Sequence, residues 1–77
     1  MKEYEFDNEI YNTIRMNIKK YRQEKGMTAS QVAEAVGLSH EYIRQIESGK
    51  KTQGFSVETL YKISVVLGVG IDKLIKK

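Results

Sequence analysis

The chain has 77 residues, a formal net charge of +3, and neither Cys nor Pro. A chain of this length forms one domain that buries only about 60–65% of the surface exposed by its unfolded state, so we expect dimerisation to support it. The composition excludes disulfides and thiolate zinc sites, and the lack of a signal peptide or a long apolar run predicts a cytoplasmic protein with no membrane segment.

Charge is distributed unevenly along the chain. Residues 1–9 carry one basic and four acidic side chains, a net charge of −3, whereas residues 10–77 carry twelve basic and six acidic side chains, a net charge of +6. The acidic segment, which also holds Tyr4 and Phe6, predicts an N-terminal arm that is either extended or frayed. The basic body suits a polyanion-binding domain, although Lys and Glu that merely solvate helix faces would give the same composition.

The first apolar repeat predicts a helix that begins near Asp7 or Asn8 and ends at about Lys25. Its apolar side chains recur at spacings of four, four and three residues, which places them on one helical face: Ile10, Ile14, Ile18 and Tyr21. Gly26 follows directly and is expected to stop the helix.

Two short helices with a tight corner between them are predicted within residues 28–49. Thr28 and Gln31 form a capping-box pattern at the start of the first helix. Its buried stripe comprises Val32, Ala33 and Val36. Gly37 is expected to close this helix with a positive φ, and Leu38 to fill the corner.

The second helix of this pair is predicted at residues 39–48, with Ser39 as its N-cap and Gly49 at its end. Ile43 and Ile46 form its inner face. Its outer face carries only side chains that form hydrogen bonds: His40, Glu41, Arg44, Gln45 and Ser48. This pattern is typical of a helix-turn-helix, whose second helix enters the major groove of DNA.

Two further helices complete an all-α prediction. Ser56 is expected to cap a helix whose inner stripe comprises Leu60, Ile63 and either Val66 or Leu67, and Gly68 to end it. If Ser64 is buried, its hydroxyl should bond to the carbonyl of Leu60. Tyr21 and Tyr61 are interpreted as packing at the core edge. A last helix is predicted at residues 71–75, with Gly70 at its N-cap.

Four sequence blocks in order resemble the Cro and phage-repressor-like (XRE-type) helix-turn-helix family. They are Arg22 with Gly26-Met27-Thr28, VAEAVGLS (32–39), IRQIESGK (43–50) and VETLYKISVVLGV (57–69). The resemblance covers residues 14–75. It implies a five-helix lambda-repressor-like DNA-binding domain at residues 10–77, preceded by the acidic arm at residues 1–9. It also implies a prokaryotic or phage transcriptional regulator, in particular a repressor, that binds a pseudo-palindromic operator as a homodimer.

The predicted site residues follow from this arrangement. Base reading is expected from the outer face of helix 39–48, by His40, Glu41, Arg44 and Gln45. Phosphate contacts are expected from Thr28, Ser30, Ser39, Tyr42, Ser48, Lys50, Lys51 and Thr52. In the family, the Arg that matches Arg22 pairs with an acid that matches Glu47. Ala29 departs from the family pattern, because relatives often have a phosphate-binding Gln there.

Other functions have weaker support in the sequence. His40 and Glu41 diverge on a helix, and no phosphate loop or HExxH pattern occurs, so we expect neither catalysis nor a metal, a cofactor or a small-molecule ligand. The alternative is a protein-interaction module, such as an antitoxin-type partner with the same fold. For the homodimer, the predicted apolar surface comprises Val69, Ile71, Leu74, Ile75 and Phe55.

Overall fold

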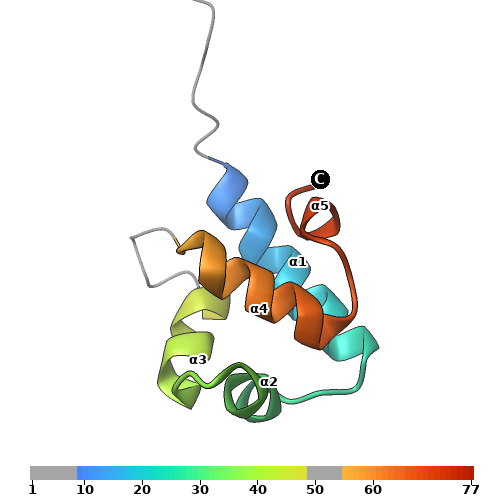
Figure 1. Ribbon diagram of the computed structural model, residues 1–77. Helices are drawn as coiled ribbons and strands as arrows, with labels where there is room; N and C mark the ends of the chain where they lie inside the picture. The colour runs from blue at the N-terminus through green and yellow to red at the C-terminus, as the bar shows by residue number, and fades with distance from the viewer. Residues whose placement is uncertain (1–8, 49–54) are drawn as a thin grey trace, which may run out of the picture.

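A computed structural model describes residues 9–48 and 55–77, which form five helices. The helices are α1 (Ile10–Glu24), α2 (Ala29–Val36), α3 (His40–Ser48), α4 (Val57–Leu67) and α5 (Ile71–Leu74). Figure 1 shows α4 crossing in front of α1, with α2 and α3 below this pair and α5 beside α1. The all-α, five-helix fold is confirmed. Apart from Glu9, the proposed arm at residues 1–9 lies outside the described residues, and so does Gly49.

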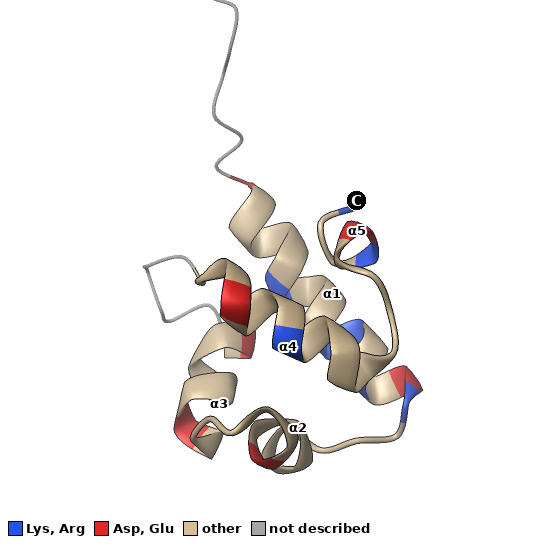
Figure 2. Cartoon of the chain, in the orientation of Figure 1, with Lys and Arg blue, Asp and Glu red and all other residues tan. Residues whose placement is uncertain are grey.

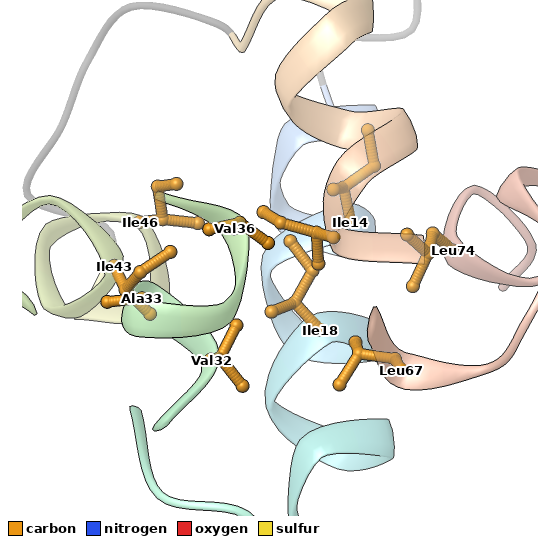
Figure 3. Packing of buried hydrophobic residues seen from close by; sticks show 10 residues of the cluster. Ile14, Ile18, Val32, Ala33, Val36, Ile43, Ile46, Leu67 and Leu74 are labelled. Carbon is orange, nitrogen blue, oxygen red and sulfur yellow. The ribbon is translucent and has the colours of Figure 1, made fainter. Parts of the chain in front are cut away.

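One apolar core holds the five helices together. Its buried members come from every helix: Ile14, Ile18, Val32, Ala33, Val36, Ile43, Ile46, Ile63, Leu67 and Leu74. Figure 3 shows these side chains converging from α1, α2, α3 and the C-terminal helices. Helices of 4 to 15 residues are unstable or marginal alone in water, so this packing supplies most of their stability.

Local capping fixes where α2, α3 and α4 begin. The Thr28 hydroxyl accepts from the Gln31 N–H at 3.0 Å, and the Gln31 side chain accepts from the Thr28 N–H at 2.8 Å, which completes the predicted capping box. Ser39 accepts from the N–H of Tyr42 at 3.1 Å, and Ser56 accepts from the N–H of Thr59 at 3.0 Å. All three predicted caps are confirmed.

The corner between α2 and α3 depends on Gly37. Its φ is +77°, as predicted, and the following N–H of Leu38 donates to the carbonyl of Ala33 at 2.9 Å. The chain changes direction within the three residues between α2 and α3, and Leu38 packs against the core from the corner. The orientation of α3 relative to α2 is therefore set by a turn that only a residue tolerant of positive φ adopts without strain.

The ends of α1 and α5 differ from the sequence prediction. α1 begins at Ile10, with Glu9 at its N-cap in a helical conformation, and the predicted caps Asp7 and Asn8 lie outside the described residues. The Glu9 carboxylate caps no backbone N–H but accepts from the amide of Asn12 at 3.1 Å. α5 ends at Leu74, one residue early.

Three side chains also correct the prediction. Ser64 is buried, but its hydroxyl donates to the carbonyl of Tyr61 at 2.7 Å rather than to that of Leu60. Tyr61 is 59% exposed, because it lies between Val57 and Val65 on the outer face of α4, turned away from Ile63. Leu74 is fully buried in the core of its own chain, so it contributes nothing to a dimer surface.

The described parts of the chain contain no helix that is both long and apolar enough to cross a membrane.

Candidate nucleic-acid interface

α3 is held against α1 and α2 by its apolar side. Ile43 and Ile46 are 0% and 1% exposed, so this side of the helix is fixed in the core. The opposite side of a helix then faces outward by its 3.6-residue period. The polar face predicted from the sequence is therefore presented to solvent by a rigidly packed helix.

The four predicted base-reading side chains share this outer face. His40, Glu41 and Arg44 are exposed and Gln45 is half-buried. The Gln45 amide donates to the carboxylate of Glu41, one turn earlier, at 3.4 Å. A bond this long is weak, so both groups keep the capacity to pair with another donor or acceptor. Together with Arg44 and Ser48 they line a shallow hollow of about 110 Å³.

Arg22 and Glu47 form the expected ion pair. The Arg22 Nε and Nη2 atoms donate to the two oxygens of Glu47 at 2.7 and 2.9 Å, and Nη1 donates to the carbonyl of Met27 at 2.8 Å. The side chains are 13% and 9% exposed. This fork joins α1 to the C-terminal turn of α3 and to the connection before α2, so it fixes the angle at which α3 projects.

The described phosphate candidates differ in how their polar groups are engaged. Thr28 and Ser39 accept capping bonds, yet each hydroxyl keeps its hydrogen for donation to a phosphate oxygen. Ser48 donates to the carbonyl of Gln45 at 3.2 Å. Ser30 is exposed, whereas Tyr42 is half-buried and packs against the core. The remaining candidates lie outside the described residues: Lys50, Lys51 and Thr52.

A second hollow, on the side of α3 that faces α1, was missed by the sequence analysis. Its volume is about 310 Å³, and it is lined by Lys19, Arg22, Ala29, His40, Arg44, Glu47 and Ser48. Lys19 was not predicted to belong to any site. Its spacing of three residues from Arg22 is a signal that could have placed both on one side of α1, once Arg22 was assigned to Glu47.

The corner, the ion pair and the outer face of α3 together define a helix-turn-helix domain. A helix-turn-helix family model matches residues 18–74, and the chain belongs to this family, of the Cro and phage-repressor type. It is 39% identical over 62 residues to the HTH-type transcriptional regulator SinR of Bacillus subtilis (strain 168), a match that covers 80% of this chain and 55% of that protein.

Two further comparisons agree with this assignment. The SinR regulator of Bacillus licheniformis is 38% identical over 64 residues, which cover 83% of this chain and 57% of that protein. A crystal structure of the biofilm regulator SinR in complex with DNA aligns with a TM-score of 0.75 and 38% identity, and the match covers 82% of this chain and 98% of that one. The chain thus spans somewhat more than half the length of these curated relatives.

Proposed function

We propose that the chain is a small prokaryotic or phage transcriptional regulator, acting as a repressor, that binds a specific sequence of double-stranded DNA. The observation that carries this proposal is the outer face of α3, which presents polar side chains while Ile43 and Ile46 anchor the helix in the core. The likeness to SinR supports it, because that regulator has a structure in complex with DNA at 38% identity. Such a protein acts in the cytoplasm.

In this proposal α3 lies in the major groove. The groove is about 12 Å wide and a helix with side chains is about 10–12 Å across, so α3 fills it. Arg44 then pairs with O6 and N7 of guanine, Gln45 with N6 and N7 of adenine, and Glu41 accepts from N4 of cytosine. His40, at the first turn, completes the reading face. The buried Arg22–Glu47 fork keeps this face at one angle to the DNA.

Affinity in this proposal comes from the backbone contacts. The hydroxyls of Thr28, Ser30, Ser39 and Ser48, the Tyr42 side chain, and Lys50, Lys51 and Thr52 after α3 are proposed to contact phosphates. These contacts set register and strength but carry no sequence information directly. Two copies of the chain bind the two halves of a pseudo-palindromic operator. The proposal requires no cofactor, membrane or small-molecule ligand.

The first experiment is a selection of bound sequences from random duplex DNA, followed by binding of Gln45→Ala to the selected operator and to its single-base variants. The variant should lose about 1–3 kcal/mol of discrimination at one base pair and bind a scrambled duplex as the native protein does. Gln23→Ala, an exposed change on α1, is the matched control and should alter neither. Equal weakening on operator and scrambled duplex would remove Gln45 from base reading.

The salt dependence of binding separates DNA recognition from the protein-interaction alternative. Each neutralised phosphate adds a log–log slope of roughly 0.9 to the loss of affinity with salt. Anisotropy titrations between 50 and 200 mM salt should therefore show a steep decline. If the native protein binds no duplex at moderate salt, the fold serves a protein partner instead.

A further inference from the structure

In the hollow between α1 and α3, Lys19 supplies a positive charge that the reading face of α3 does not use. Arg22 and Glu47 neutralise each other there through two hydrogen bonds. Neither Lys19 nor Arg44 has a carboxylate partner within the ranges that the structure describes. Two unpaired cationic side chains therefore line one hollow. Figure 2 shows basic positions of α1 behind α4.

The two hollows beside α3 share a common rim. Arg44 and Ser48 line both of them, so the hollow toward α1 borders directly on the outer face of α3. A helix that fills the major groove has a sugar-phosphate strand along each flank, because the groove is hardly wider than the helix. One of these strands then runs along the flank where Lys19 lies, and the other along the opposite flank.

The hollow is large enough for a phosphate group. Its volume of about 310 Å³ is some ten times the roughly 30 Å³ that one water molecule occupies in the liquid. Ala29, at the start of α2, also lines it and contributes only a methyl group. No long side chain from α2 therefore lines this space, and the charged side chains that line it come from α1 and α3.

We propose that this hollow receives one phosphate of the DNA backbone, bound by the Lys19 ammonium group, while Arg44, which borders the hollow, stays with the reading face of α3. The inference rests on the proposed DNA binding and adds a contact from α1, a helix to which no nucleic-acid role was assigned. Lys19 suits this task because its ammonium group is a compact charge on a flexible stem and needs no fixed geometry. Arg22 is less suited, because Glu47 neutralises its charge and three of its five N–H groups already donate to Glu47 and Met27.

Two neighbouring lysines give a matched test. Lys19 and Lys20 are both exposed, but Lys20 does not line the hollow and its Nζ lies 5.2 Å from the ring centroid of Tyr21. Lys19→Ala and Lys20→Ala each remove one charge from α1. Lys19→Ala should weaken binding to operator and scrambled duplex by the same factor and lower the salt slope by about one unit. The ratio of the native affinity to the Lys19→Ala affinity should fall about threefold between 50 and 200 mM salt. Lys20→Ala should leave the slope unchanged.

Neutral methylphosphonate substitutions, placed one at a time along the operator, locate the contact. At one phosphate that flanks the half-site, this substitution should weaken DNA binding by the native protein but leave binding by Lys19→Ala unchanged. A general effect of charge would not produce such a coupling between one lysine and one phosphate. Lys19→Arg should restore the sensitivity. Indistinguishable slopes for the two alanine variants, or no coupled phosphate, would overturn this inference while the DNA-binding proposal stands. If the native protein fails to bind any duplex, both fall together.

Discussion

At the scale of single residues, the Arg22–Glu47 fork decides how firmly α3 is held. The pair is nearly enclosed, so its strength depends little on salt, and removal of one partner leaves the other charge without compensation. The third guanidinium nitrogen of Arg22, Nη1, donates to the carbonyl of Met27 before α2. The fork therefore couples three elements through one side chain of α1.

We expect Arg22→Ala to lower the free energy of unfolding by about 3 kcal/mol, because the Glu47 carboxylate is left buried and unpaired. The double variant Arg22→Met with Glu47→Met should recover most of this loss, since apolar side chains of similar volume replace the pair. Urea unfolding followed by circular dichroism measures both. An Arg22→Ala protein within about 0.5 kcal/mol of native stability would show that the fork contributes little.

The residues predicted correctly are those whose role is local. Thr28 and Gln31 bond to each other within one turn, and Gly37 needs only its own φ, so neighbours in sequence suffice to find them. Lys19 could not be found this way, because its place depends on how α1 crosses α3. The Arg22–Glu47 pair is also non-local, and only the family resemblance indicated it.

At the scale of elements, the corner between α2 and α3 requires a positive φ at Gly37, and this requirement can be tested separately from side-chain packing. A Cβ added to Gly37 would meet no atom within 4 Å, so a substitution there is opposed by the φ of +77° alone. Gly37→Val should lower stability by about 2 kcal/mol, whereas Gly37→Asn, which tolerates this conformation, should cost less than about 1 kcal/mol. Thermal unfolding should place the Val variant about 10 °C below native. Equal melting temperatures for the two variants would contradict this account.

α5 contributes Leu74 to the core, although the sequence predicts this side chain to belong to a dimer surface. Leu74 is 0% exposed, and the amide of Asn17 on α1 donates to the carbonyls of Leu74 and Lys76, both at 2.8 Å. The Leu74 carbonyl ends α5 and the Lys76 carbonyl lies two residues beyond the helix, so neither has a partner inside it. The sequence indicates that Ile71, Leu74 and Ile75 are apolar, but not whether their own chain or a second one covers them.

Leu74→Ala should therefore destabilise the isolated chain by about 3 kcal/mol, through lost burial and the cavity left behind. Ile75 is 43% exposed, and Ile75→Ala should cost at most about 1 kcal/mol. Both are measured by urea unfolding at several protein concentrations. If the loss of stability caused by Leu74→Ala disappeared at low protein concentration, Leu74 would instead lie in an interface between two chains.

At the scale of the whole molecule, the fold separates support from recognition. All five helices contribute to the core, while α2 and α3, which carry the corner and the outer polar face, lie on one side of the α1–α4 pair (Figure 1). The fold was predictable from the sequence because each helix carries its own start signal, stop signal or apolar stripe. A dimer surface could not be predicted in the same way, because helical periodicity separates apolar from polar faces but does not distinguish a core from an interface. Leu74 is buried in the core, so among the apolar side chains predicted to form a dimer surface Ile75 is the one that the structure leaves exposed.

The arrangement of two chains on DNA gives the last prediction. A two-fold dimer places its two α3 helices in successive major grooves, so its half-sites must lie about 10–10.5 base pairs apart, centre to centre. Two chains should bind a selected operator cooperatively, and five inserted base pairs between the half-sites should abolish cooperativity, because one half-site then faces the opposite side of the duplex. Sedimentation of labelled duplex measures the stoichiometry, with a single half-site as control. If the second chain binds with the same affinity at every spacing, the two copies act independently. The homodimer would then be contradicted, even if α3 reads the half-site.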